Sequence, residues 1–273
     1  MEPDRTQLLA WLAAHVVAGA DEALLAQPIN CFASVTQTEK QPAAPLLPEP
    51  PQRSKAPRRA APVLPRADPP VLDEGANAVA KSAPDLAALE RALEEYEGCS
   101  LKKTATNTVF GDGNPQAGLM VIGEAPGAEE DRLGRPFVGA AGQLLDRMLA
   151  AIGFTNRETY YITNVCYWRP PGNRKPSDAE LAACRPFTLR QIALIRPRLI
   201  LLLGGVSAQN MLGRTEGITR LRGKWAEIAV DDIVVPALPS FHPAYLLRQP
   251  LAKREAWRDL QALAEKWREI TPA

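Results

Sequence analysis

The sequence lacks the features of a membrane or secreted protein. Its strongly apolar run Leu199–Leu203 is far too short to span a bilayer. No basic-then-apolar signal peptide opens the chain, because the first hydrophobic stretch is interrupted by His15 and followed by acidic residues. Cysteine is also scarce, and four scattered residues do not make a secreted disulfide scaffold. We therefore predict a cytoplasmic protein that does not bind membranes.

Proline is abundant in only one part of the chain. Of the 29 residues from Pro42 to Pro70, 10 are proline, a composition that packed domains do not carry. Hydrophobic residues make up 46% of the whole chain, which is enough for a sizeable core elsewhere. We predict an N-terminal amphipathic helix region over 1–37, a Pro/Ala-rich disordered linker over 38–81 and a folded domain over 82–273.

The two ends of the chain differ in character. Apolar residues at helical spacing predict a helix over residues 4–26, with Trp11 on an apolar face that needs a partner. Residues 1–98 carry 9 basic and 14 acidic side chains, whereas residues 99–273 carry 23 basic and 17 acidic ones. The basic part of the chain is compatible with a polyanionic partner.

Strands and helices alternate in the predicted folded domain. The predicted strands are short and apolar, and they span residues 118–122, 160–163, 198–203 and 233–238. The predicted helices span residues 82–97, 142–152, 178–195 and 252–267. Strands separated by helices form parallel sheets that are covered on both faces. The predicted fold class is therefore α/β, with three α/β/α layers around a central, mainly parallel four-stranded sheet.

Unusual motifs follow the predicted strands, at the edge where parallel sheets bind ligands. The glycines of the turn Gly123–Gly127 let the backbone approach a ligand and present free N–H groups. This turn is neither a P-loop nor a dinucleotide-binding turn, because the residues that define those motifs are missing. Asn164 ends the next strand, and its amide suits the edge of a planar base. An Asn at a strand end is, however, usually a turn former.

Two further motifs are basic or titratable. Arg169–Arg174 is a rigid basic loop that suits phosphate groups, unless it is only a solvated connector. His242 is one of only two histidines in the chain, and it stands at the mouth of the predicted sheet. A lone histidine is more often structural, but this position favours a catalytic role.

Taken together, the motifs resemble those of the family 4 uracil-DNA glycosylases. The resemblance extends from about residue 97 to residue 267, with the motifs in the same order and spacing. The segments that carry it are Gly123–Gly127, Pro136–Gly139, Asn164, Arg169–Arg174 and His242–Arg248. The resemblance implies the uracil-DNA glycosylase fold and a base-excision repair enzyme, a hydrolase that flips uracil out of DNA and leaves an abasic site.

The resemblance also implies roles for individual residues. Phe137 would stack on uracil, and Asn164 would bond its Watson–Crick edge. His242 and the N–H groups of the turn would stabilise the leaving uracil anion. Glu124 would orient the water or bond the substrate, a choice that the sequence leaves open. The implied catalytic residues are Glu124 and His242, the uracil-binding residues Gly123, Ala125, Phe137 and Asn164, and the DNA-binding residues Arg174, Leu246, Leu247 and Arg248, with Leu246 or Leu247 as the wedge.

The sequence differs from the family at the residues that would bind the metal cluster. Family 4 members usually hold a four-iron four-sulfur cluster with four cysteines. The matching positions here are Tyr96, Cys99, Trp168 and Cys184, so only two thiols remain in place. Cys166 lies two residues from the third position and is a conceivable substitute. We expect the cluster to be absent and Tyr96 and Trp168 to fill its place by apolar packing.

Two other functions remain open at this stage. The chain could be a non-catalytic or damage-sensing DNA-binding member of the superfamily, because Ala125 stands where the classical glycosylases have Asp. It could also be an interaction module whose functional part is the Pro-rich leader, although Phe137, Asn164 and His242 together argue against a scaffold. The expected partners are uracil-containing DNA, single- or double-stranded, and a repair or replication protein at the N-terminal helix. We expect a monomer.

Overall fold

The computed structural model describes residues 73–271. The predicted helix over 4–26, the N-terminal region 1–37 and most of the linker lie outside the described residues, as does Cys31. Among the helices of residues 73–271, none is both long and apolar enough to cross a membrane.

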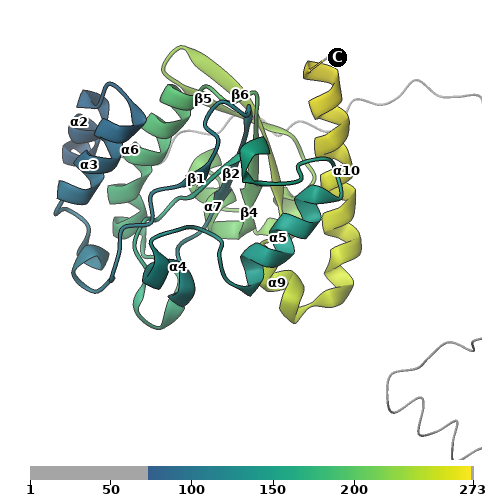
Figure 1. Ribbon diagram of the computed structural model, residues 1–273, viewed down its shortest axis with the longest axis horizontal. Coiled ribbons are helices and arrows are strands. Elements are labelled where there is room, and N and C mark those ends of the chain that lie inside the picture. Colours follow the sequence, from purple (N-terminus) through teal and green to yellow (C-terminus); the bar gives the residue numbers. More distant parts are fainter. Residues whose placement is uncertain (1–72, 272–273) are drawn as a thin grey trace, which may run out of the picture. The chain divides into compact units, whose positions relative to one another are not determined.

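A six-stranded sheet forms the centre of the domain (Figure 1), in the order β1-β3-β2-β4-β6-β5. The four inner strands pair in parallel and correspond to the four that the sequence predicts. The predicted number of strands was wrong, because antiparallel strands extend both edges. The strands are β1 (Asp112–Gly113), β2 (Leu119–Gly123), β3 (Tyr161–Asn164), β4 (Leu199–Leu203), β5 (Ala226–Val230) and β6 (Ile233–Ser240).

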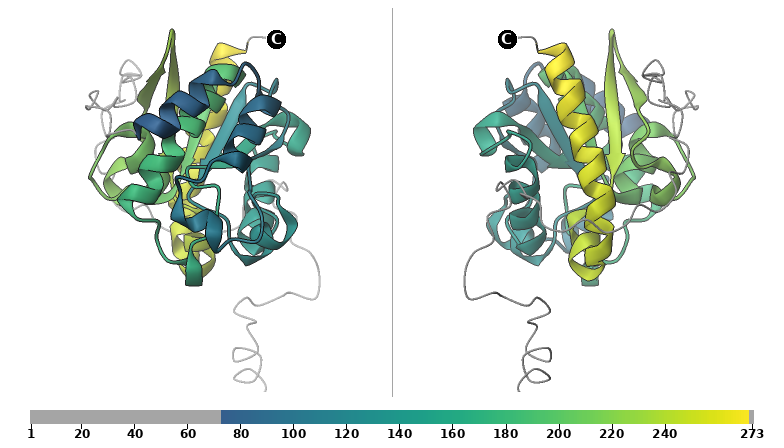
Figure 2. Two further views of the ribbon diagram at one scale, coloured as in Figure 1. Left: turned by 90° about the vertical axis from the view of Figure 1, so that its left-hand side faces the viewer. Right: turned by 90° about the vertical axis from the view of Figure 1, so that its right-hand side faces the viewer.

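Side chains on the inner strands alternate between two apolar cores, one on each face of the sheet. Met120 and Ile122 of β2 face the core shared with α6 and α7, whereas Leu119 and Val121 face the core shared with α5 and α10. Strands buried on both faces require helices on both faces, and this gives the three layers (Figure 2). The helices are α2 (Glu74–Ser82), α3 (Leu86–Glu95), α4 (Ala128–Leu133), α5 (Ala140–Ala150), α6 (Asp178–Ile195), α7 (Gly204–Leu212), α8 (Ile218–Leu221), α9 (Pro243–Arg248) and α10 (Lys253–Ile270).

The N-terminal boundary of the folded part differs from the predicted one. Residues 74–82 form α2, although the sequence analysis placed residues up to 81 in a disordered linker. Asp73 caps this helix by accepting from the Ala76 N–H, and Ala76 and Ala80 are fully buried against the α3–α6 side of the domain. The helix was missed because its buried residues are alanines, which give only a weak apolar period. The described domain therefore includes α2.

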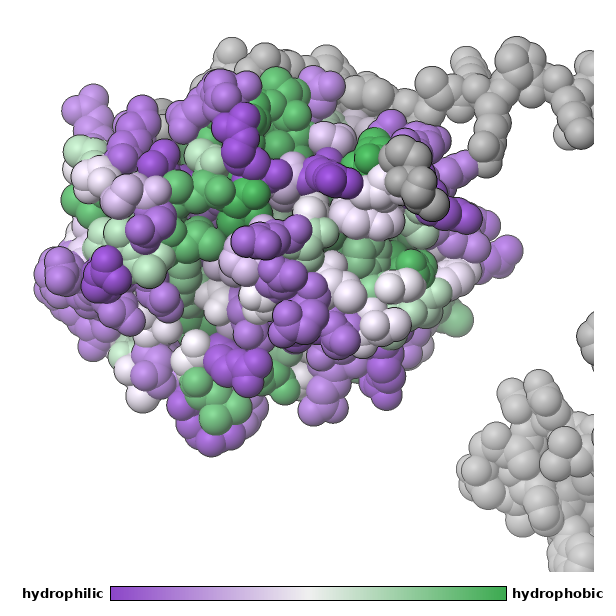
Figure 3. Space-filling view, turned by 45° about the horizontal axis from the view of Figure 1, so that its top comes forward, coloured by the Kyte–Doolittle hydropathy of each residue, from purple (hydrophilic) through white to green (hydrophobic). Residues whose placement is uncertain are grey.

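The parallel strands place their carboxyl ends at one edge of the sheet. In the view of Figure 1 this is the lower edge, where α4 and α9 lie. The space-filling view tilts the other edge forward and shows hydrophilic residues over much of the surface, with hydrophobic residues between them (Figure 3). Because the sequence motifs follow the parallel strands, they lie at the carboxyl edge of the sheet, where α/β folds bind their ligands.

Candidate active site

Strand register brings the predicted site residues together. Gly123 at the end of β2 pairs with Asn164 at the end of β3. Leu203 of β4 pairs with Ser240 of β6, so the chain reaches His242 two residues beyond that pair. A Cβ atom placed on Gly204 would lie 3.1 Å from the His242 Cβ, so the β4–α7 turn passes directly beneath the histidine.

Gly123 lies where Phe137 and Asn164 meet. A Cβ atom at this position would lie 2.4 Å from both the Asn164 Oδ1 and the Phe137 Cζ, so no side chain fits here. The Phe137 and His242 rings are 5.7 Å apart between centroids. Asn164 is 1% exposed, and its Oδ1 has no hydrogen-bond partner among residues 73–271. A buried amide oxygen without a partner costs free energy, and this indicates that a ligand donor occupies the position during function.

The backbone of Phe137 is held in a strained conformation. Its φ of +55° lies in the left-handed region, which non-glycine residues rarely adopt. Arg157 donates to the Phe137 carbonyl at 2.9 Å, and Asp146 pairs with that guanidinium at 3.1 Å. A Cβ atom at Gly142 would lie 1.8 Å from the same carbonyl, so α5 can approach the turn only with glycine there. The fold thus fixes the Phe137 ring at the site.

One carboxylate joins the two loops that frame the site. Glu130 on α4 accepts from the Gly127 N–H at 3.0 Å through one oxygen. Its other oxygen accepts from the Val138 and Gly139 N–H groups at 3.0 and 2.9 Å. The sequence analysis assigns no role to Glu130. The available signal was its position three residues after Gly127, at which a glutamate side chain can accept from the N–H of a helix N-cap residue.

His242 is held as a neutral donor. Burial lowers its pKa to about 4, and the positive charge of Arg248 adds to the effect. The Ala244 N–H donates to the His242 Nδ1 at 3.2 Å. Because Nδ1 accepts a hydrogen bond, the neutral ring carries its proton on Nε2. This side chain therefore presents an N–H donor at the carboxyl edge of the sheet.

Glu124 and Ala125 follow Gly123 but have different environments. Burial raises the pKa of Glu124, and the nearby charge of Lys175 opposes the rise. The Glu124 carbonyl accepts from the Cys166 N–H at 3.1 Å, which extends the pairing of β2 and β3 by one residue. Ala125, predicted to bind uracil, packs against the cluster that contains Cys166.

Of the residues predicted to contact DNA, some are exposed to solvent, whereas others are buried or paired with another side chain. Leu246 is fully buried and packs with Phe241 and Leu144, whereas Leu247 is 44% exposed. Of the two candidates for the wedge, only Leu247 is therefore available on the surface. Arg248 is exposed. Arg174 makes a two-pronged ion pair with Glu180, with N···O distances of 2.8 and 2.6 Å.

Three thiols gather beside the site, within an apolar cluster of α2, α3, α6 and the β3–α6 connection. Cys99, Cys166 and Cys184 are at most 1% exposed, and the Cys166 and Cys184 Sγ atoms lie 4.0 Å apart. Trp168 is buried among them, and its indole donates to the Thr108 Oγ at 3.0 Å. The Tyr96 ring packs against the Phe187 ring in a tilted arrangement, with ring centroids 5.3 Å apart. We call these residues the thiol–aromatic cluster.

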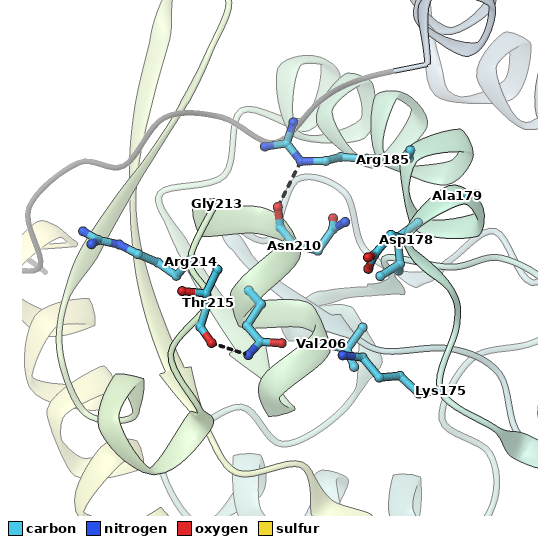
Figure 4. A pocket seen from close by; sticks show the side chains of 12 residues that line it. Lys175, Asp178, Ala179, Arg185, Val206, Asn210, Gly213, Arg214 and Thr215 are labelled. Carbon is cyan, nitrogen blue, oxygen red and sulfur yellow. Dashed lines mark hydrogen bonds between the residues drawn. The ribbon is translucent and has the colours of Figure 1, made fainter.

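A cavity of about 700 Å³ lies away from these residues, between α6 and α7 (Figure 4). Arg185 on its wall donates to the Asn210 carbonyl at 3.0 Å, and burial lowers the pKa of Arg185 to about 10. Gly123, Phe137, Asn164 and His242 do not line it. The residues predicted from the sequence therefore form a site of their own at the sheet edge.

Comparisons with known proteins identify the family of the sequence. The sequence matches the Uracil DNA glycosylase superfamily over residues 110–261. It is 40% identical over 180 residues to a Type-4 uracil-DNA glycosylase of Pyrobaculum aerophilum, covering 64% of this chain and 91% of that protein. Type-4 uracil-DNA glycosylases of Archaeoglobus fulgidus and Thermotoga maritima are 42% and 44% identical, over 64% and 57% of this chain and 89% and 80% of those proteins.

Proposed function

The chain belongs to the Uracil DNA glycosylase superfamily, and we propose that it excises uracil from DNA by hydrolysing the N-glycosidic bond in base excision repair. The convergence of Phe137, Asn164 and His242 around Gly123 supports this proposal most directly. A base inside a duplex cannot be attacked, so the substrate nucleotide must first be extruded. The residues of the sheet edge then receive the flipped base.

Recognition of uracil depends on Asn164 and Phe137. The unpartnered Asn164 Oδ1 accepts the N3–H of uracil, and the amide nitrogen donates to O4. Cytosine presents the opposite pattern, an acceptor at N3 and a donor at N4, and would leave both partners mismatched. The Phe137 ring supplies the stacking surface. Because the fold fixes both side chains, little reorganisation is needed on binding.

His242 stabilises the leaving group. As the glycosidic bond breaks, negative charge develops on the uracil oxygens, and the Nε2–H of a neutral histidine donates to the developing anion. The backbone N–H groups of Glu124 and Ala125 add to this field, since Pro126 has no N–H and the Gly127 N–H is donated to Glu130. A single donor of this kind contributes about 3–4 kcal/mol to transition-state stabilisation.

Glu124 orients the attacking water in this mechanism. Ala125 replaces the acid of the classical glycosylases, so Glu124 is the carboxylate next to the site on this turn. Burial raises the pKa of Glu124 and the nearby charge of Lys175 opposes the rise, and a raised pKa makes this carboxylate a stronger base toward water. The ionised form accepts the water proton as the water adds to the sugar.

The pH profile of excision tests the role of Glu124. Because the pKa of Glu124 is raised and its ionised form is the active one, the rate is expected to fall on acidification at a pH above the ordinary value for glutamate. Glu124→Gln is expected to lower the rate about 100-fold and to abolish this limb of the profile. Single-turnover rates across the pH range measure both. An unchanged limb in the Gln variant would assign the titration to another group.

The side chains of the thiol–aromatic cluster do not fit the four-iron four-sulfur group that the family usually holds. Such a cluster needs four thiolates or close substitutes, and three cysteines are present among residues 73–271, with Tyr96 and Trp168 at the other two of the family's positions. Two of their sulfur atoms touch at 4.0 Å, and the Trp168 and Phe187 rings fill the space around them. We therefore propose that this chain works without the cluster, with α3 and α6 joined by packing instead.

Metal analysis tests this proposal directly. Protein purified without oxygen is expected to contain no stoichiometric iron and to lack the visible absorption of an iron–sulfur protein. Cys184→Ala is expected to leave the uracil-release rate within about twofold, because no ligand is lost. About four irons per chain in the anaerobic protein would contradict the proposal.

Release of free uracil decides between excision and the alternatives. Oligonucleotides with one uracil, single-stranded or paired with guanine or adenine, are incubated with the protein, and abasic sites are cleaved with alkali. Matched oligonucleotides with cytosine or thymine are the controls. Tight binding of uracil-containing DNA without release would favour a damage-sensing protein, and absence of both would favour an interaction module.

We propose further that the protein acts as a cytoplasmic monomer. Support comes from the site, because all of its residues come from one chain. The N-terminal helix over 4–26 is the proposed contact for a repair or replication protein, and it lies outside the described residues.

A further inference from the structure

Exposed apolar side chains are concentrated directly after the catalytic histidine. Tyr245, Leu247 and Leu251 are 37%, 44% and 94% exposed, and they lie within seven residues of one another. Tyr245 and Leu247 belong to α9, and Leu251 lies in the 3-10 turn Pro250–Ala252 that follows. A leucine that is 94% exposed gains nothing from folding, so its apolar surface is available to a partner.

The same stretch carries an excess of positive charge. Arg248, Lys253 and Arg254 are all exposed. The neighbouring Glu255 lies 3.7 Å from the Arg222 guanidinium, which offsets its charge. Apolar side chains flanked by cations fit a polyanion with an apolar interior, and a DNA duplex has this composition.

The exposed residues stand on a rigid base. Leu246 and Ala256 are at most 1% exposed and pack with Phe241 and Leu144. The Gln249 N–H donates to the Tyr245 carbonyl at 2.8 Å, and the Ala252 N–H donates to the Gln249 carbonyl at 3.1 Å. Since α9 begins at the His242 cap, the apolar residues have a fixed position relative to the catalytic ring.

We propose that Leu251 is a second DNA-inserting residue, which contacts the base step beside the one that Leu247 enters. The proposal rests on the proposed function. Extruding a nucleotide leaves two unstacked neighbours, and separating stacked bases costs a few kcal/mol per step. One leucine covers one side of that gap. A second leucine at a fixed position keeps the adjacent step open, so it is a positioning residue for duplex substrates.

The substitution Leu251→Ala tests the proposal without endangering the fold. Uracil release is measured on a duplex and on the corresponding single strand. The duplex rate is expected to fall about tenfold, which corresponds to the free energy lost when one leucine side chain is no longer buried against the bases. The single-strand rate is expected to stay within about twofold. Leu251→Phe, which restores apolar surface, is expected to recover the duplex rate. Val234→Ala removes a 56% exposed apolar residue on β6 and serves as the matched control.

A second measurement reports the unstacking of the DNA bases directly. The fluorescent base 2-aminopurine, placed next to the uracil, brightens when it is unstacked. Binding of the Leu251→Ala variant is expected to give a smaller increase than binding of the wild type or of Val234→Ala.

Two results would overturn the inference. An unchanged duplex rate would show that the Leu251 side chain does not assist opening of the duplex. Equal losses on duplex and single strand would show a general contribution to DNA binding. Absence of uracil release by the wild type would instead contradict the proposed function.

Discussion

Replacing His242 by alanine is expected to lower the rate of uracil excision about 1000-fold at neutral pH. The structure holds this ring neutral, because burial lowers its pKa to about 4, and the hydrogen bond that Nδ1 accepts leaves the proton on Nε2. Loss of one preorganised donor to a developing anion costs about two to three orders of magnitude in rate. Single-turnover kinetics on a single-stranded oligonucleotide measure the loss, because that substrate needs no duplex opening.

Two matched variants separate this effect from damage to α9. His242→Asn keeps an acceptor for the Ala244 N–H but removes the distant donor, and it is expected to be as inactive as His242→Ala. His242→Gln places an amide donor near the Nε2 position and is expected to retain part of the activity. Similar thermal unfolding of all three would attribute the rate differences to the donor. Full activity of His242→Asn would contradict the mechanism.

The substitution Asn164→Asp is expected to lower uracil excision about 1000-fold and to shift the preference toward cytosine. A site built to hydrogen-bond its substrate rejects a mismatched partner strongly, because buried groups are left unpaired. An aspartate accepts but does not donate when ionised, so it loses the bond to uracil O4 and gains one from cytosine N4. Rates on uracil- and cytosine-containing single strands give the ratio.

The pH dependence of this variant provides an internal check. Residue 164 is buried, so the new carboxyl group is expected to have a raised pKa. Its protonated form donates a hydrogen bond, so the deficit of the variant relative to the wild type at the same pH is expected to shrink as the pH falls, although Glu124 lowers both rates. Asn164→Ala, which has neither donor nor acceptor, is expected to lose uracil excision without gaining cytosine excision. An unchanged uracil rate in Asn164→Ala would remove this residue from the site.

The fold could be predicted from the sequence to the extent that apolar patterns are strong. The run Leu199–Leu203 is unmistakable as a buried strand, and α6 was predicted with its observed bounds, Asp178–Ile195. β1 has only two residues, and its pairing with β3 depends on tertiary contacts. β5 alternates buried and exposed residues over five positions, too few to identify beside a longer strand. α2 is buried through alanines, which sequence patterns do not distinguish from linker residues.

The site residues that lie in short sequence motifs could be predicted from the sequence. Gly123, Phe137, Asn164 and His242 belong to four separate sequence motifs, and the structure brings them together. The contacts that hold them could not be found in this way, because Glu130 and Arg157 act on backbone groups distant in sequence. Burial likewise decides between Leu246 and Leu247, which are equivalent in the sequence.

The triple hydrogen bonding of Glu130 has a consequence for motion. Because one carboxylate accepts from Gly127, Val138 and Gly139, the loop at residues 138–139 cannot move away from α4 without breaking both of its hydrogen bonds to Glu130. Opening of this loop therefore costs two charge-assisted hydrogen bonds, which raises its local opening free energy. A nucleotide entering the site meets a loop that is already tied to α4 before it binds.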